Sequence, residues 1–172
     1  QAKFLVKKLK AFQISTGDML REEIQNESEI GKKILSDMND GKFVSDQIVN
    51  TLIENVLLDS KKRGRLIFDG YPRSLTQAEN LEQLLKKTNQ TIDFIFFLNV
   101  NKEMIIERIK QRKIIEKRAD DDLETIIKRY DTYMDTTKPV LNFYSKNSNF
   151  YEIDGGCKIE EITAKIDNFL NV

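Results

Sequence analysis

The sequence has 172 residues, of which 40% are hydrophobic, and its 28 basic side chains balance its 28 acidic ones. This length and apolar share are typical of one globular domain, and the charge balance argues against a nucleic-acid-binding or membrane-surface protein. The absence of histidine excludes His-based triads and imidazole metal ligands, so catalysis would depend on Arg, Lys, Asp and Glu.

The single cysteine, Cys157, has no second cysteine for an internal disulfide or for a thiolate zinc site. No apolar run approaches the length of a membrane span, and the first residues lack the hydrophobic core of a signal peptide. We therefore expect a cytoplasmic protein without zinc, without nucleic-acid partners and without a membrane partner.

The first third of the chain is predicted to be mainly helical. Apolar residues at three- and four-residue spacing predict helices over about 1–10, from Gly17, over 28–39 and from Ser45 to Gly64. Ser15 and Thr16 are the N-cap candidates of the second helix. The segment 15–44 is poor in apolar residues, so we expect it to form a small movable lobe.

The middle of the chain combines short apolar runs with helical patterns. Leu66 to Phe68 predicts a short strand, and Ile92 to Val100 predicts a strand buried on both faces. Thr76 and Glu79 have the spacing of a capping box for the helix between these strands. A further helix is predicted over 101–113.

The last third is predicted to contain two helices and a strand, followed by the C-terminal helix. Apolar stripes predict a helix over 123–134, a new helical start at Pro139, a strand over 149–155 and a helix over 159–170. Helices alternating with short buried strands indicate an α/β fold with a parallel sheet. In such sheets ligands lie at the carboxyl ends of strands, and 69–73 is such an end.

Several arginines recur at spacings that place them together. Arg108 and Arg112 are four residues apart on a predicted helix, and Arg118 and Arg129 are eleven apart, close to three helical turns. A guanidinium group is permanently charged and matches phosphate oxygens, so converging arginines indicate a polyanionic ligand. Taken singly, each arginine would more often be a solvated surface charge or an ordinary ion pair, and it is their spacing that favours a shared site.

Three acids follow predicted strand or connector ends. Asp69 ends a strand, and Asp120 and Asp121 precede a helix. A carboxylate beside phosphates binds Mg²⁺, often through water, or tethers an arginine. For Asp120 and Asp121, helix capping is an equally good explanation.

Five ordered blocks together resemble the adenylate kinase family over essentially the whole chain. They are ISTGDMLR (Ile14 to Arg21), GKFVSD (Gly41 to Asp46), FDGYPRSLTQAENL (Phe68 to Leu81), the pair Arg108 and Arg112, and RADDDLETIIKRYDTYMDTTKPVLNFY (Arg118 to Tyr144). The resemblance implies a three-layer, P-loop NTPase-like parallel sheet with helices on both faces. It also implies a core domain (1–14, 45–110 and 122–172), an AMP-binding lobe (15–44) and a short lid (111–121).

The resemblance also implies the roles of individual residues. The family's AMP site corresponds to Thr16, Arg21, Lys42, Phe43, Val44, Gly70, Tyr71, Pro72, Arg73, Gln77, Arg118 and Arg129. Arg21 and Arg73 would hold the phosphate of AMP, and the Gln77 amide would pair with the adenine edge. The ATP side corresponds to Arg108, Arg112 and the backbone near Cys157.

Catalysis in this family would rest on Arg73, Arg108, Arg112, Arg118 and Arg129, with Asp69, Asp120 and Asp121 as the acids near the metal and the lid. Mg²⁺ would enter with ATP, with no direct protein ligand except Asp69 through water. The expected partners are ATP, AMP and ADP, and the family suggests a monomer.

The sequence departs from the family pattern in four places. Tyr71 stands where phenylalanine is common, Gln111 where glycine is often found, and Gly156 and Cys157 replace a more usual polar pair. The family's glycine-rich P-loop is also absent, so we expect about fifteen further residues upstream, comprising a strand and this loop.

The expected reaction is reversible transfer of the γ-phosphoryl group of MgATP to AMP by direct in-line attack. Three alternatives remain, of which one is an α/β protein whose arginines are incidental. A UMP or CMP kinase would share the arginines but differ at Thr16 and Gln77, and a non-catalytic nucleotide sensor would bind without turnover.

Overall fold

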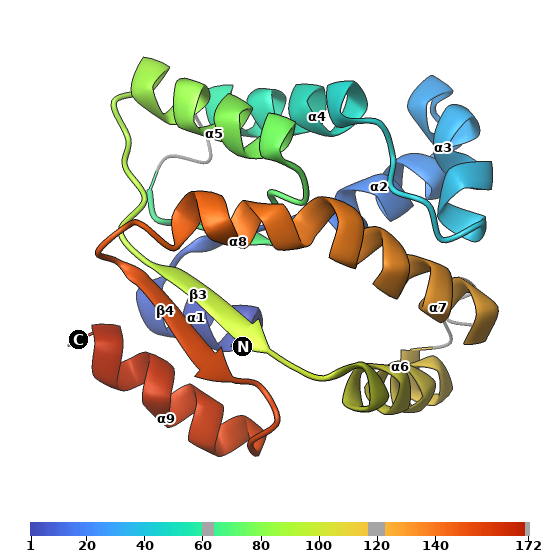
Figure 1. Ribbon diagram of the computed structural model, residues 1–172. Helices are drawn as coiled ribbons and strands as arrows, with labels where there is room; N and C mark the ends of the chain where they lie inside the picture. The colour runs from blue at the N-terminus through green and yellow to red at the C-terminus, as the bar shows by residue number, and fades with distance from the viewer. Residues whose placement is uncertain (60–63, 117–122, 171–172) are drawn as a thin grey trace.

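The computed structural model describes residues 1–59, 64–116 and 123–170 (Figure 1). The elements are, in chain order, α1 Ala2–Leu9, β1 Phe12–Ser15, α2 Thr16–Gln25, α3 Glu29–Asn39, α4 Asp46–Leu58, β2 Leu66–Asp69, α5 Leu75–Lys87, β3 Ile95–Asn99, α6 Lys102–Glu116, α7 Leu123–Thr132, a π-helical turn Tyr133–Thr137, α8 Lys138–Tyr144, β4 Phe150–Asp154 and α9 Ile159–Leu170. Among the described helices, none is both long and apolar enough to cross a membrane.

The strands form two parallel pairs. β1 pairs with β2, with Ser15 opposite Asp69, and β3 pairs with β4, with Asn99 opposite Asp154. Parallel strands separated by helices confirm the predicted α/β class. The predicted single sheet is replaced by two pairs, because no hydrogen-bonded ladder joins the described residues of β2 to those of β3.

The strand β3 is less buried than predicted, because a cavity lies between the β1–β2 pair and the β3–β4 pair. β3 was expected to be buried on both faces, but four of its residues, Ile95 to Leu98, are only half-buried. These four residues and Leu66 to Phe68 of β2 line the same cavity. The sequence of β3 is apolar, as in a strand buried on both faces, but its side chains are only half-buried because they line this cavity.

Helices cover both sides of the strands. In Figure 1, α4 and α5 lie beyond α8 on one side of the β3–β4 pair, while α9 lies on the other side, and α2 and α3 form a group at one end of the molecule. The largest core cluster joins β1, α2, α3, α4 and α5 around Ile14, Ile34, Ile53 and Leu81. A second cluster joins α1, β4 and α9 around Ile153 and Ile166.

Side-chain caps set the starts of several helices. Ser15 accepts a hydrogen bond from the Asp18 N–H, as predicted, and Ser28 accepts one from Gly31. The predicted capping box at Thr76 was wrong: the N-cap of α5 is Ser74, two residues earlier, and its side chain accepts a hydrogen bond from the Gln77 N–H.

Two helix ends and one strand also differ from prediction. α4 ends at Leu58, before Gly64, and α6 continues beyond 113 to Glu116, so the first residues of the expected lid are helical. The strand β1 was not predicted, because Phe12–Ser15 is only four residues long and its last residue also caps a helix. Short strands carry too little periodicity to be separated from a loop.

Candidate functional site

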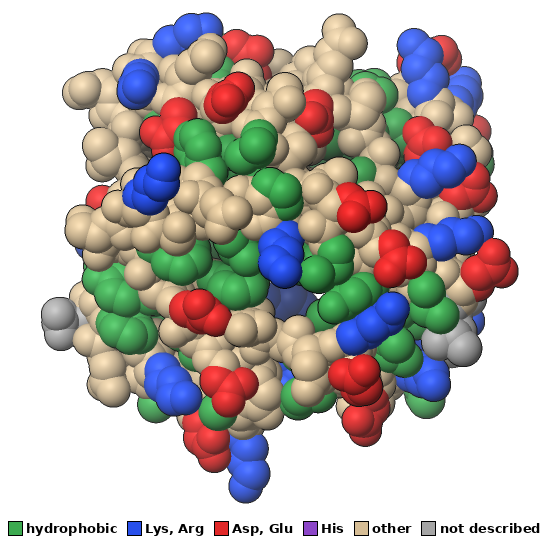
Figure 2. All heavy atoms as spheres, in the orientation of Figure 1, with side chains coloured by type: hydrophobic (Ala, Val, Ile, Leu, Met, Phe, Trp, Pro, Cys, Tyr) green, Lys and Arg blue, Asp and Glu red, His purple; other side chains and the backbone are tan. Residues whose placement is uncertain are grey.

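A large cavity opens where the carboxyl ends of β1 and β2 meet. Its volume is about 2500 Å³, and it continues into the space between the two strand pairs. The face drawn in Figure 2 is hollowed near its centre, with hydrophobic and basic side chains around the hollow. Every described residue of the expected AMP site lines this cavity: Thr16, Arg21, Lys42, Phe43, Val44, Gly70, Tyr71, Pro72, Arg73, Gln77 and Arg129.

The turn after β2 is held by hydrogen bonds to one carbonyl group. The Gly70 oxygen accepts from the Thr16 hydroxyl at 3.0 Å and from Arg73 Nε at 2.8 Å. Gly70 has a φ of 69°, and a Cβ there would lie 2.9 Å from Arg73 Nη2. The positive φ favours glycine at this position, and any larger side chain would also have to displace the end of the Arg73 guanidinium group.

Arg73 is the centre of positive charge in the cavity. Desolvation lowers its pKa below the ordinary value, although solvent still reaches the side chain, and the positive charge of Arg129 lowers the pKa further. Asp69 opposes this shift, and Arg21 adds a smaller lowering effect. An arginine stays protonated under these conditions, so three like charges are held together around a space that suits an anion.

Aromatic and acidic neighbours orient two of these arginines. Arg73 Cζ lies 5.1 Å from the centre of the Phe43 ring, a cation–π contact. Arg21 Nη2 lies 2.5 Å from Asp18 Oδ1. Lys42, at the cavity rim, pairs with Asp40 at 3.0 Å.

Gln77 is buried, with 3% of its surface exposed. Its Oε1 accepts from the Arg73 N–H at 2.8 Å, and its Nε2 donates to Asp46 Oδ1 at 2.7 Å. The Tyr71 hydroxyl lies 3.2 Å from the Gln77 carbonyl oxygen and 2.9 Å from Asn50 Oδ1. The amide keeps a second N–H and a second lone pair for a ligand.

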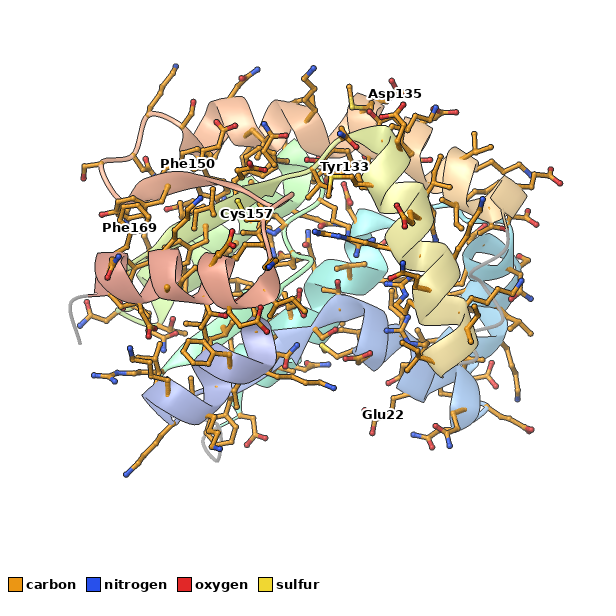
Figure 3. The ribbon with its side chains drawn as sticks, turned by 90° about the horizontal axis from the view of Figure 1, so that it is seen from below. Glu22, Tyr133, Asp135, Phe150, Cys157 and Phe169 are labelled. Atoms are coloured by element: carbon orange, nitrogen blue, oxygen red, sulfur yellow. The ribbon has the colours of Figure 1, made fainter. Side chains whose placement is uncertain are left out.

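The residues expected on the ATP side are divided between the cavity lining and the surface beside it. Arg112 lines the cavity, whereas Arg108 donates to the Gly155 carbonyl at 2.7 Å and lies outside the cavity lining. Cys157, also outside the lining, has its sulfur 3.6 Å from Asp154 Oδ2 and from Lys165 Nζ, next to the start of α9 (Figure 3). The Arg108 bond therefore brings α6 to the loop that carries Cys157.

Three expected residues, Arg118, Asp120 and Asp121, lie outside the described residues. Asp69 lines the cavity and accepts from Gln13 Nε2 at 2.8 Å, which leaves further carboxylate lone pairs. Within 1–59, 64–116 and 123–170, no three acidic or thiol side chains group closely enough to hold a metal ion. A single carboxylate fits Mg²⁺ that is bound mainly by water and nucleotide phosphates.

Some residues of the site were not predicted from the sequence. Asp46 and Ser74 support Gln77, and the Thr137 hydroxyl donates to the Arg73 carbonyl at 2.9 Å. Asp46 could be read only as the first residue of a helix, and Thr137 only as a residue between the helix predicted over 123–134 and the helical start at Pro139. Their contacts join distant parts of the chain, so no local spacing indicates them.

Comparison with known proteins identifies relatives over nearly the whole chain. A family model described as adenylate kinase matches residues 1–149. The adenylate kinase of Pelagibacter ubique strain HTCC1062 is 48% identical, with 100% of this chain and 93% of that protein aligned. Those of Caulobacter sp. strain K31 and of Mycoplasma mycoides are 38% and 36% identical, covering 100% and 96% of this chain and 91% and 87% of theirs.

Proposed function

Because the chain belongs to the adenylate kinase family, and with it to the P-loop NTPase-like α/β folds, we propose that it is an ATP:AMP phosphotransferase that forms two ADP. The observation that carries this proposal is the convergence of Arg21, Arg73 and Arg129 on one cavity. Like charges held so close repel one another, and although Asp18 and Asp69 offset part of this repulsion, a polyanion between the arginines would offset more of it. The phosphate of AMP and the phosphoryl group in transfer supply that charge.

We propose the following mechanism. An oxygen of the AMP phosphate attacks the γ-phosphorus of ATP in line, the P–O bond to ADP breaks, and no covalent enzyme intermediate forms. Arg21 and Arg73 bind the acceptor phosphate, while Arg112, Arg118 and Arg129 spread the charge of the group in transfer, and Arg108 supports the ATP side through Gly155. Asp69 would hold Mg²⁺ through water, and the ion would supply positive charge beside the phosphates of ATP.

The division into a core, an AMP-binding lobe (15–44) and a short lid (111–121) is part of the same proposal. It is supported by the position of α2 and α3 at one end of the molecule (Figure 1), where the two helices pack closely on each other and share a core cluster with α4 and α5. Closure of these segments over bound nucleotides would exclude water, which otherwise competes as the phosphoryl acceptor. We further propose that the enzyme acts as a monomer in the cytoplasm.

The roles of the arginines are tested by truncation in the full-length protein. We expect Arg73→Ala or Arg129→Ala to lower the rate of AMP phosphorylation by about 10²-fold or more, with the melting temperature retained. Lys110→Ala, which removes an exposed charge on α6, is the control and keeps the wild-type rate. Wild-type turnover in either arginine variant would contradict the assigned roles.

The acceptor base is tested by measuring phosphorylation of AMP, UMP, CMP and GMP side by side with MgATP. We expect AMP to be the best acceptor, because a glutamine amide matches the donor and acceptor of the adenine edge. A preference for UMP or CMP would instead favour the pyrimidine kinase alternative. Binding without turnover of any of the four would favour the nucleotide sensor.

A further inference from the structure

We propose that Asp46 is a positioning residue that fixes the orientation of the Gln77 amide and thereby the choice of adenine over bases with the reversed hydrogen-bonding order. This inference rests on the proposed function, because it assigns the acceptor base to Gln77. Asp46 is half-buried at the start of α4, 31 positions from Gln77 in the sequence.

The carboxylate of Asp46 contacts the start of α5 with both oxygens. Oδ1 accepts from Gln77 Nε2 at 2.7 Å, and Oδ2 accepts from the Ser74 hydroxyl at 2.8 Å. The Ser74 oxygen in turn accepts from the Gln77 N–H at 3.1 Å. Asp46 thus holds both the side chain of Gln77 and the residue that caps its helix.

The partners of Gln77 allow only one orientation of its amide. An ionised carboxylate can only accept a hydrogen bond, and the backbone N–H of Arg73 can only donate one. Turning the amide by 180° would place Oε1 against the Asp46 carboxylate and the NH₂ group against the Arg73 N–H. Both contacts would then be repulsive, and Gln77 is too buried for water to replace them.

A fixed amide distinguishes bases by the order of donor and acceptor. Adenine presents an amino donor beside a ring-nitrogen acceptor, whereas hypoxanthine and guanine present a carbonyl acceptor beside an N–H donor. A glutamine amide that can rotate pairs with either kind of base. An amide held in one orientation by Asp46 pairs only with the amino donor and ring-nitrogen acceptor of adenine. AMP and IMP differ at these positions and carry the same ribose and phosphate, so they form a suitable pair of probes.

The test compares kcat/KM for AMP and IMP in the full-length enzyme and in Asp46→Asn, whose side chain can donate as well as accept. We expect the ratio of AMP to IMP to fall about tenfold, because one orientation-dependent bond to a charged group is lost. The KM for AMP should rise while kcat stays within about twofold, since the base lies away from the group in transfer. In Asp46→Glu, which keeps a carboxylate acceptor, the ratio of kcat/KM for AMP to that for IMP should fall less than in Asp46→Asn.

Glu54→Gln is the matched control, because it removes one negative charge from an exposed position of the same helix. It should leave the AMP to IMP ratio unchanged. The inference is overturned if Asp46→Asn keeps the wild-type ratio, if Glu54→Gln lowers it equally, or if AMP and IMP activities fall by the same factor together with the melting temperature.

A spectroscopic readout separates this inference from the proposed function. In the ¹⁵N–¹H spectrum of the wild-type protein, one side-chain amide proton of Gln77 should be shifted downfield and exchange slowly, and Asp46→Asn should abolish both properties. Rapid exchange of both Gln77 amide protons in the wild type would overturn the inference. If the wild type shows the protected proton but does not phosphorylate AMP, the proposed function fails while Asp46 still holds the amide.

Discussion

The hydroxyl group of Tyr144 is buried and lies without a hydrogen-bond partner among the described residues. The ring packs with Ala78 and Val140 in the small cluster between α5 and α8. Burial raises the pKa of this hydroxyl strongly, and the nearby negative charge of Glu82 raises the pKa further. A polar atom in this position weakens the core, because its hydration is lost without replacement.

We therefore predict that Tyr144→Phe raises the free energy of unfolding, by about 1 kcal/mol, since the ring is kept and only the unpartnered hydroxyl is removed. The measurement is urea denaturation at pH 7. A loss of more than about 1 kcal/mol would contradict this view and show that the hydroxyl has a stabilising partner.

The same substitution should change the alkaline limb of the stability curve. Above the ordinary tyrosine pKa of 10.0, the unfolded chain releases this proton while the folded protein retains it, so folding stability falls as pH rises. This loss is about 1.4 kcal/mol for each pH unit and for each such group. The free energy of unfolding, measured from pH 9 to 11, should therefore fall less steeply with pH in Tyr144→Phe than in the wild type.

At the level of elements, α2 and α3 pack closely through a glycine. Gly31 is buried, and a Cβ built there would overlap the Glu23 carbonyl group on α2. Ser28 joins the same two helices, because its hydroxyl donates to Glu23 and accepts from the Gly31 N–H. The segment expected to bind AMP is thus a tight pair of helices with its own cap.

We predict that Gly31→Ala destabilises the protein by about 1–3 kcal/mol. Alanine favours a helix by about 1 kcal/mol over glycine, but overlap with backbone atoms outweighs that gain. Lys33→Ala, at an exposed position of α3, is the control and should change stability by less than about 0.5 kcal/mol. Thermal denaturation of both variants checks the prediction, and equal stability would show that α2 and α3 can move apart without cost.

At the scale of the whole molecule, positive and negative charges balance, but three positive side chains lie close together at the cavity. The formal net charge is zero, whereas Arg21, Arg73 and Arg129 act on one another electrostatically. Affinity for an anion should therefore arise from this local group and not from a long-range field.

We predict that salt weakens AMP binding several-fold between 0.1 M and 1 M NaCl, over which the screening length falls from about 10 Å to about 3 Å. Isothermal titration of the full-length protein at both salt concentrations provides the measurement. Adenosine, which lacks the phosphate, is the control, and its affinity should change much less. Equal salt dependence for AMP and adenosine would argue against phosphate binding by the arginines.

Most helices and strands could be predicted from the sequence, and so could a set of residues that the structure brings to one cavity. The periodicity of α9 and the cap at Ser15 are local properties, and the structure confirms both. The turn 69–73 was also recognisable, because an apolar strand followed by Asp, Gly, Pro and Arg changes from core to site within a few residues. These features depend on neighbours in the chain, which is why sequence patterns predict them.

Tertiary structure alone decided how these pieces meet. The pairing of the strands into β1–β2 and β3–β4 depends on contacts more than 50 residues apart in the sequence, and so does the bond from Thr16 to Gly70. The same holds for Asp46, which looks like an ordinary helix start until Gln77 is folded against it. The sequence by itself thus determined which arginines were candidates for holding a phosphate. The packing of α4 against α5 decided how the Gln77 amide is held, because side-chain orientation depends on partners that only the folded chain supplies.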